Sequence, residues 1–379
     1  MDSKDNPDMK ERFEVQGGET NELNEFSNKR SRIKLIILIV IILLVIALII
    51  LLICLLKGGS TDTNDNADNK GSETIEEKFP AIFDVDEGGD DMIAYMLANI
   101  SQKFDILGIT TVTPDHIIDD VTNIWLRFLE YMNFDAKIYK GQDHPLVRKT
   151  EPKPFYHDYQ LEFPLTNKTA ETKNAVDFMI ETIKNSKKKV TLFLLAPLTN
   201  FATAYQRDKS IINNIEEIII MGGTKADGNM EENPKAEYNI YQDAEAANIV
   251  FNCGIKPKVL GTDVTHKTEM TNEIYDKYLK LNTKASYFTY CAMKGTFVTW
   301  GDNYVHDPIT VMYRLNRSTL ELKEYYSYVD TNNPDVKGTT YGTMYFLEPS
   351  SENKSNIYYP EKINLTLYWE NFDSLVSKY

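Results

Sequence analysis

The balance of apolar and polar residues divides the chain into four segments. Residues 1–34 are polar, mixed in charge and poor in apolar side chains, which is typical of a disordered tail. Residues 35–56 carry no charge and are nearly all Leu, Ile and Val; as a helix they would extend about 33 Å, enough to cross a bilayer. Residues 57–77 are rich in Gly, Ser, Thr, Asn and Asp, which predicts a flexible stalk. Residues 78–379 carry the alternating patterns of a globular domain.

The apolar run at residues 35–56 predicts a single-pass membrane helix rather than a cleaved signal peptide. It exceeds the roughly 7–15 apolar residues of a signal peptide, follows a long polar segment and has no clear cleavage site. Basic residues concentrate on its N-terminal side, which is therefore expected to stay in the cytoplasm: Lys29, Arg30, Arg32 and Lys34, against Lys57 alone beyond it. Asn-x-Ser/Thr triplets occur only after the run, at Asn99, Asn167, Asn316, Asn353 and Asn364. These patterns predict a type II protein whose globular part is extracellular or luminal.

Within residues 78–379, short apolar runs alternate with amphipathic helical patterns. The predicted strands are Ile106–Val112, Lys189–Leu195, Glu217–Met221 and Lys256–Leu260, and the predicted helices are Val121–Met132, Ala175–Lys184 and Ala244–Phe251. This alternation indicates one large α/β domain with an open, mostly parallel, mixed central sheet flanked by helices on both faces. After Asn332 the pattern becomes strand-rich, with Gly338 and Gly342 as expected turn positions.

Charge and cysteine content argue against a nucleic-acid partner and against a cysteine-based zinc site. The formal net charge of −15 argues against a nucleic-acid backbone as a partner. The three cysteines have no zinc-type Cys/His spacing. Cys54 lies in the apolar run, and Cys253 and Cys291 are compatible either with a disulfide or with two buried thiols.

The stretch from Ile82 to Ile93 carries the densest candidate chemistry. Asp84 and Asp86 are two residues apart at the end of an apolar run, so their side chains leave a strand on the same face. Two glycines follow, and Asp90 and Asp91 then begin a helical pattern, where the positive end of the helix favours them. A single Asp in such a place is commonly a helix cap, but four around one turn repel one another, and a hard divalent cation would relieve the repulsion.

Three known carboxylate motifs can be compared with this stretch. An EF-hand loop counted from Asp84 would need an oxygen ligand at Gly88 and Glu in place of Tyr95, so it is excluded. A phosphatase-like DxDx[TV] motif would need Thr or Val at Gly88 and is excluded as well. The DxD pair of a glycosyltransferase is compatible with Asp84 and Asp86 alone.

Further polar groups follow other apolar runs, as expected of ligand sites at the carboxyl ends of parallel strands. They occur at Leu194–Asn200, Met221–Thr224, Gly228-Asn229, Glu237-Tyr238-Asn239, Gly261–His266 and His306-Asp307-Pro308. Their amides and carboxylates suit hydrogen bonding to sugar hydroxyls, and the turn after Leu195 can offer a backbone carbonyl to a cation.

Taken in order, these motifs resemble the inosine–uridine preferring nucleoside hydrolase family. The resemblance rests on Asp84-x-Asp86-x-Gly88-x-Asp90-Asp91, Pro197-Leu198-Thr199-Asn200, Met221-Gly222-Gly223, Glu237-Tyr238-Asn239, Asp243-x-Glu245-Ala246-Ala247 and His306-Asp307-Pro308. It covers residues 78–379 and none of the first 77. It implies the Rossmann-like nucleoside hydrolase fold and a dimer or tetramer.

The resemblance also implies a role for each site residue. One Ca²⁺ would be held by Asp86, Asp91, Asp307 and the carbonyl of Leu195, and a water on that ion would attack after Asp86 takes its proton. His306 matches the residue associated with protonation of the leaving base, and Asp84 matches a supporting carboxylate. The positions expected to contact the nucleoside are Asp90, Asp115, His157, Asn229, Glu237, Tyr238, Asn239 and Trp300.

The sequence departs from the family pattern in three places. The second family strand usually ends in an Ala-Gly-Asn-like turn whose Asn meets the substrate, and Asp115 stands in that position here. Glu87 stands where the first motif usually has Pro. A family loop with a His-Gly start is matched only by His157. Base specificity is expected in that loop and near Trp300, whose ring can either stack on a purine or pack in the core.

The sequence therefore predicts a membrane-anchored, calcium-dependent hydrolase that releases a free base and ribose from nucleosides. Two alternatives remain open. A type II DxD glycosyltransferase would share the anchor and stalk but leaves Asp90, Asp91, His306 and Asp307 unexplained. A non-catalytic nucleoside-binding surface protein is compatible with Asp115 in place of the family Asn.

Overall fold

The computed structural model describes residues 78–154, 163–332 and 340–379. The predicted tail, membrane helix and stalk, together with His157 and Gly338, lie outside the described residues. Among the residues that are described, none of the helices has the length and apolar character needed to cross a bilayer.

In the described residues, nine strands form one sheet in the order β3-β2-β1-β4-β5-β6-β9-β7-β8. Their bounds are β1 Phe79–Val85, β2 Phe104–Thr111, β3 Ile138–Lys140, β4 Val190–Leu194, β5 Ile215–Met221, β6 Lys258–Leu260, β7 Leu320–Val329, β8 Met344–Leu347 and β9 Ile357–Ile363. The strands from β3 to β9 in this order pair in parallel, and β7 pairs antiparallel with β9 and β8. The predicted open, mostly parallel, mixed sheet is confirmed.

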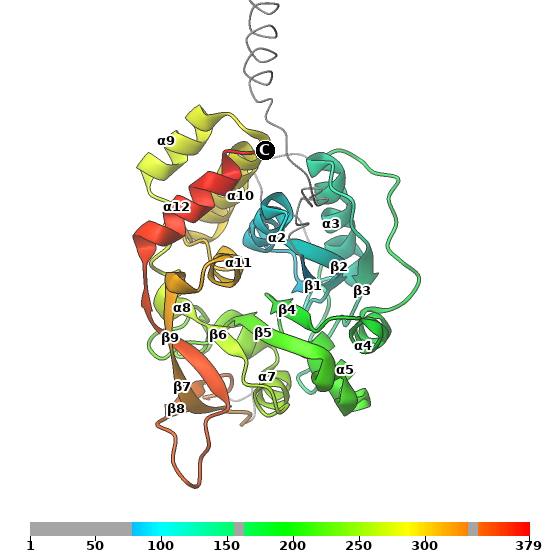
Figure 1. Ribbon diagram of the computed structural model, residues 1–379, viewed down its shortest axis with the longest axis vertical. Helices are drawn as coiled ribbons and strands as arrows, with labels where there is room; N and C mark the ends of the chain where they lie inside the picture. The colour runs from blue at the N-terminus through cyan, green and yellow to red at the C-terminus, as the bar shows by residue number, and fades with distance from the viewer. Residues whose placement is uncertain (1–77, 155–162, 333–339) are drawn as a thin grey trace, which may run out of the picture. The chain divides into compact units, whose positions relative to one another are not determined.

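Helices cover both faces of this sheet (Figure 1). Their bounds are α2 Gly89–Ser101, α3 Ile118–Met132, α4 Ala175–Asn185, α5 Thr199–Arg207, α6 Tyr238–Gln242, α7 Ala244–Phe251, α8 Thr262–Thr265, α9 Asn272–Leu281, α10 Lys284–Trp300, α11 Pro308–Leu315 and α12 Leu365–Val376. The predicted strands and helices are all present, with ends shifted by a few residues.

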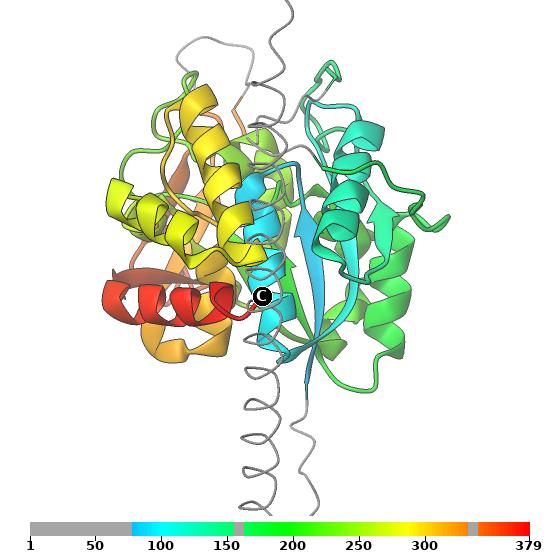
Figure 2. The same ribbon diagram turned by 90° about the horizontal axis from the view of Figure 1, so that it is seen from above.

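Two hydrophobic cores lie on opposite faces because successive strand residues point to opposite sides. On β1, for example, Phe83 belongs to the core under α2, α3 and α10–α12, whereas Ile82 belongs to the core under α4, α5 and α7. The C-terminal helices α10 and α12 lie beside α2 in both views (Figures 1 and 2). The helix that carries the acidic pair is therefore buried over most of its length, from Asp91 to Ala98.

The C-terminal part and the cysteines settle two sequence-based expectations. The strand-rich pattern after Asn332 corresponds to β8 and β9, and Gly342 has φ of 77°, as expected of a turn glycine. Cys253 and Cys291 are both buried free thiols, so the disulfide alternative is wrong.

Candidate active site

Four aspartates converge where β1 meets α2. Ligand oxygens of Asp90, Asp91 and Asp307 lie within 4.8 Å of one another. Asp86 lies beside them and is connected to the same turn by two hydrogen bonds. Its side-chain Oδ1 accepts from the Gly88 amide at 2.9 Å, and its backbone amide donates to Asp91 Oδ1 at 3.2 Å. A Cβ at Gly88 would lie 2.4 Å from Asp91 Oδ2 and 2.9 Å from Asp90 Oδ1, so glycine is required for the carboxylates to approach.

The electrostatics of this cluster fit a hard cation. Burial raises the pKa of Asp91 and of Asp307, and neighbouring carboxylates raise both further. One oxygen of Asp307 is buried without a hydrogen-bond partner. An oxygen-only donor set with this much like charge is the environment that Ca²⁺ favours in proteins. Residues Asp86, Asp90, Asp91 and Asp307 therefore fit a divalent cation site.

Asp84 lies behind this cluster and is held by neighbouring elements. Its Oδ1 accepts hydrogen bonds from Thr110 Oγ1 on β2 at 2.5 Å and from Asn200 Nδ2 on α5 at 2.8 Å. Burial raises the pKa of Asp84 to about 7, although both hydrogen bonds favour the ionised form. Asp84 is thus held by hydrogen bonds from two neighbouring elements, and the supporting role that the family resemblance implies for it stays a prediction.

The residues expected to bind the sugar form a second hydrogen-bonded group. Glu237 caps α6 by accepting from the amides of Asn239 at 3.0 Å and Ile240 at 3.1 Å, and it also accepts from the Gly223 amide at 2.9 Å. Asn239 Nδ2 donates to the carbonyl of Leu195 at 2.7 Å, while its buried Oδ1 has no partner. The structure thus brings the predicted cation-binding carbonyl against a predicted sugar-binding amide.

Asn229 and Tyr238 meet at the start of α6. The amide of Tyr238 donates to Asn229 Oδ1 at 2.8 Å, and the Asn229 side chain is exposed. The Tyr238 hydroxyl lies close enough to Glu87, Asp115 and Asp86 for their charges to raise its pKa, after the larger effect of burial. Both residues therefore border the carboxylate region from the α6 side.

His306 is fixed at both ring nitrogens. Nδ1 lies 2.7 Å from Thr265 Oγ1 and Nε2 lies 3.2 Å from Asp302 Oδ2. Burial opposes the charged form, but the hydrogen bond and charge of Asp302 outweigh it and raise the pKa of His306. Close by, His266 stacks on Tyr304 with ring centroids 4.5 Å apart. Sequence reasoning missed Asp302 and Thr265 as partners; the only available signal was that Asp302 precedes His306 by four residues.

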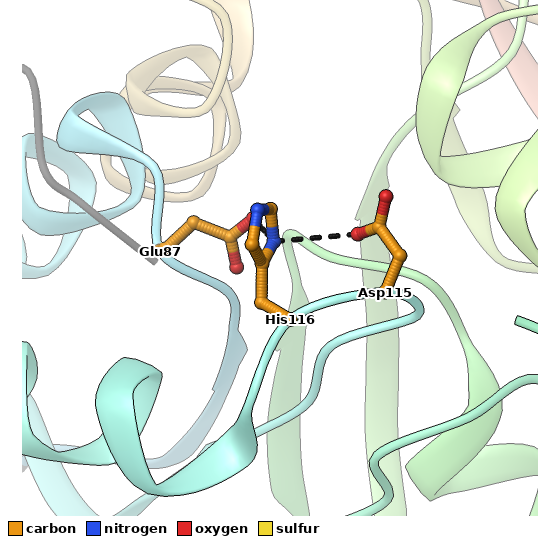
Figure 3. Close-up of side chains that lie close together, drawn as sticks. All are labelled: Glu87, Asp115 and His116. Atoms are coloured by element: carbon orange, nitrogen blue, oxygen red, sulfur yellow. Dashed lines mark ion pairs between the residues drawn. The ribbon is translucent and has the colours of Figure 1, made fainter. Parts of the chain in front are cut away.

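The two acidic departures from the family pattern lie beside each other. His116 Nδ1 lies 2.9 Å from Glu87 Oε1 and 3.3 Å from Asp115 Oδ1, with the imidazole between the two carboxylates (Figure 3). The hydrogen bond to Glu87 raises the pKa of His116, against partial burial. Sequence reasoning did not single out His116.

Trp300 is the last residue of α10, and its predicted base contact, like that of His157, stays a prediction.

The fold and site together define an α/β protein with a cluster of buried carboxylates at the carboxyl ends of parallel strands. Residues 81–370 match the family model of the inosine-uridine preferring nucleoside hydrolase, and the chain belongs to this family. It is therefore an enzyme of the N-ribosyl hydrolase class. This assignment sets aside the glycosyltransferase alternative, whose DxD pair leaves Asp90, Asp91 and Asp307 unused.

Relatives and solved structures agree with the family. A pyrimidine-specific ribonucleoside hydrolase of Escherichia coli is 32% identical over 275 residues, which cover 70% of this chain and 87% of that protein. The structure of a purine-preferring ribonucleoside hydrolase from Gardnerella vaginalis matches with a TM-score of 0.70 at 24% identity, over 79% of this chain and 98% of the other. A nucleoside hydrolase from Bacillus anthracis matches with a TM-score of 0.64 at 18% identity, over 79% and 100%. At these identities the structural matches show the fold alone.

Proposed function

We propose that the chain is a Ca²⁺-dependent ribonucleoside hydrolase that cleaves the N-glycosidic bond and releases a free base and ribose. The observation that carries this proposal is the cluster of Asp90, Asp91 and Asp307, whose ligand oxygens lie within 4.8 Å of one another. Asp86 adjoins this cluster, because its backbone amide donates to Asp91 Oδ1 and its Oδ1 faces the same Gly88. The family supports the reaction class, and the donor set supports a hard cation.

The cation would be held by Asp86, Asp91 and Asp307 together with the Leu195 carbonyl. When bound, it would act as a Lewis acid that orients a water molecule and lowers its pKa. Asp86 accepts the proton of the attacking water, as a carboxylate positioned next to its substrate can. The remaining negative charge of the pocket stabilises the oxocarbenium-like transition state of the ribose.

Sugar recognition falls to Asp90, Asn229, Glu237 and Asn239. Glu237 and Asn239 are already fixed by hydrogen bonds to Gly223 and Leu195, so little side-chain freedom is lost when hydroxyls bind. A ribose held in this way keeps its anomeric carbon in position while the ring flattens.

The departing base needs a proton, and His306 is the residue we assign to deliver it. Asp302 and Thr265 fix the imidazole, and Asp302 favours its protonated form. The proposal covers ribonucleosides as a class, because the relatives are named as pyrimidine-specific in one case and purine-preferring in another.

The test uses the purified full-length protein and follows ribose release from inosine, uridine and a chromogenic riboside. We expect turnover with Ca²⁺, its loss in chelator, and a fall of about 100-fold or more in kcat for Asp86→Asn. Asp143→Asn is the matched control, because Asp143 is exposed and pairs only with the neighbouring His144 among the contacts described. Tight nucleoside binding without turnover would instead establish the non-catalytic binding protein.

The location of the enzyme is a separate part of the proposal. The apolar run 35–56 and the basic residues before it support a type II anchor in the lipid bilayer, with residues 78–379 outside the cytosol or in a lumen. Protease added to sealed cells or vesicles would then remove the catalytic domain while leaving the first 34 residues protected. Recovery of the protein in the soluble fraction would reject the anchor.

The dimer or tetramer expected from the family is tested by light scattering of the same preparation.

A further inference from the structure

Glu87, Asp115 and His116 form a compact group of potential metal ligands outside the Asp86–Asp91–Asp307 cluster. One ligand atom from each lies within 4.8 Å of the others. Glu87 comes from the turn between β1 and α2, and Asp115 and His116 come from the turn between β2 and α3. Because these two strands are neighbours in the sheet, their carboxyl-end turns meet, and the imidazole of His116 lies between the carboxylates of Glu87 and Asp115 (Figure 3).

The spacing of the donor atoms suits a tetrahedral ion. Bonds of about 2.0–2.1 Å at tetrahedral angles separate neighbouring ligand atoms by about 3.3 Å. His116 Nδ1 lies 2.9 Å from Glu87 Oε1 and 3.3 Å from Asp115 Oδ1. The oxygens of Glu87 and Asp115 lie within 4.8 Å of each other, so binding draws the two carboxylates toward a shared ion. The side chains of Glu87, Asp115 and His116 are 13%, 31% and 25% exposed, so an ion from solution can reach them.

The backbone of the second turn is already fixed. The His116 amide donates to Thr113 Oγ1 at 3.0 Å, and the Asp115 carbonyl accepts from the Lys153 amide at 2.8 Å. The next residue, Ile117, donates its amide to the Lys153 carbonyl at 2.9 Å. The backbone that carries two of the three donors is thus preorganised, which lowers the entropic cost of binding.

The donor set differs in kind from that of the aspartate cluster. An imidazole nitrogen with two carboxylate oxygens suits Zn²⁺ and related d-block ions, whereas Ca²⁺ prefers oxygen donors alone. The local charge also favours a second cation, because Asp86 adds its negative charge to those of Glu87 and Asp115 around His116. Three protein ligands leave a fourth position for water, as in open zinc sites.

We propose that Glu87, Asp115 and His116 bind one Zn²⁺-class divalent cation at a second site, separate from the aspartate cluster. The ion cross-links the turns after β1 and β2 at the edge of the pocket. If the proposed hydrolase activity holds, this added positive charge opposes the cationic transition state, so occupancy inhibits turnover. The binding itself does not depend on that activity.

The test measures Zn²⁺ and Ca²⁺ content together by equilibrium dialysis of the full-length protein without a polyhistidine tag, at buffered free Zn²⁺ and in saturating Ca²⁺. Wild type is expected to take up one Zn²⁺ per chain with its Ca²⁺ content unchanged. His116→Gln is expected to lower Zn²⁺ affinity at least about tenfold. His144→Gln is the matched control, because His144 faces a single carboxylate, Asp143 at 2.6 Å, and should bind Zn²⁺ as wild type does.

A second variant guards against a folding artefact. Asp115→Asn keeps the shape of the side chain and removes its charge, and it should weaken Zn²⁺ binding in the same direction with an unchanged Tm in chelator. Equal Zn²⁺ uptake by wild type and His116→Gln would overturn the site. Loss of one Ca²⁺ for each Zn²⁺ gained would overturn it too, because the ion would then have entered the aspartate cluster. Zn²⁺ binding by a protein that hydrolyses no nucleoside would keep this site and reject only the proposed function.

Discussion

The carboxylate of Asp302 lies 3.2 Å from Nε2 of His306, while the hydroxyl of Thr265 lies 2.7 Å from Nδ1 of the same ring. The imidazole is thus oriented by two residues that the sequence motif does not contain. Burial alone would lower the pKa of His306, and Asp302 makes the largest contribution to raising it, with smaller contributions from the charges of Asp90 and Glu237. A carboxylate that orients and charges a buried histidine is a positioning residue for proton delivery.

Asp302→Asn should therefore lower kcat on nucleosides by about tenfold to 100-fold and change KM little. The loss should be smaller on a riboside whose leaving group is an acidic phenol, because such a group departs without a proton. Steady-state kinetics on inosine, uridine and a nitrophenyl riboside measure the difference. Asp105→Asn, at an exposed position on β2, is the control expected to behave as wild type. Equal losses on all three substrates would show that Asp302 maintains the fold of the pocket instead.

Gly88→Ala should disable the cation site with little effect on the metal-free fold. The backbone at Gly88 has φ of −60° and ψ of 140°, which alanine adopts without strain. The added methyl would lie 2.4 Å from Asp91 Oδ2, so the carboxylates must separate. We expect Ca²⁺ affinity to fall at least about tenfold in calorimetric titrations.

Gly301→Ala separates this effect from general destabilisation. Gly301 has φ of 73° and open space around it, so alanine there costs about 1 kcal/mol of backbone strain and touches no carboxylate. It should lower Tm equally with and without Ca²⁺. Gly88→Ala should instead lose the Tm increase that Ca²⁺ produces in wild type, and retention of that increase would contradict the steric argument.

The sequence was sufficient for the aspartates of the first motif because they are local, whereas Asp307 was grouped with them only by the family resemblance. Asp84, Asp86, Asp90 and Asp91 sit on one strand, one turn and one helix start, where period-2 and capping rules act within eight residues. The sheet class was predictable for a similar reason, since alternation of strand and helix patterns constrains parallel pairing. What periodicity does not encode is which distant strands become neighbours, such as β6 beside β9 and β7 beyond it.

Contacts between turns were missed for that reason. His116 meets Glu87 only because β2 pairs with β1, and Asn239 reaches Leu195 across a separation of 44 residues. The partner of His306 was missed because no single strand or helix holds both it and Asp302, although only four residues separate them. Side-chain partnership depends on turn geometry, which residue spacing alone leaves undetermined.

Asn200→Ala should be strongly destabilising because Asn200 joins three parts of the sheet edge. Its Nδ2 donates to Asp84 Oδ1 at 2.8 Å and to the Thr111 carbonyl at 3.0 Å, and its Oδ1 accepts from the Gln142 amide at 2.9 Å. Removing a fully buried amide leaves these groups unsatisfied, at an expected cost of about 3 kcal/mol in urea unfolding. Asn214→Ala, which loses half-buried bonds to the carbonyls of Ile183 and Ser186, should cost about 1 kcal/mol. Similar costs for both variants would argue against a special role for Asn200.

Glu217→Gln tests the charged group at the start of β5, far in sequence from the aspartate cluster. Burial raises the pKa of Glu217, but the hydrogen bond and charge of Arg317, with the charges of Lys258 and Arg314, outweigh it and lower that pKa below 4.5. A carboxylate with a lowered folded-state pKa adds stability above its unfolded pKa and loses it as the pH falls through the folded value. The variant should thus unfold about 2 kcal/mol more easily at neutral pH, below the range for fully buried pairs because Arg317 is half exposed. The free energies of unfolding in urea of wild type and Glu217→Gln should converge as the pH falls. Glu216→Gln, at the exposed neighbouring position, is the control and should follow wild type at every pH. A difference between wild type and Glu217→Gln that persists in acid would show that Glu217 acts by packing rather than by charge.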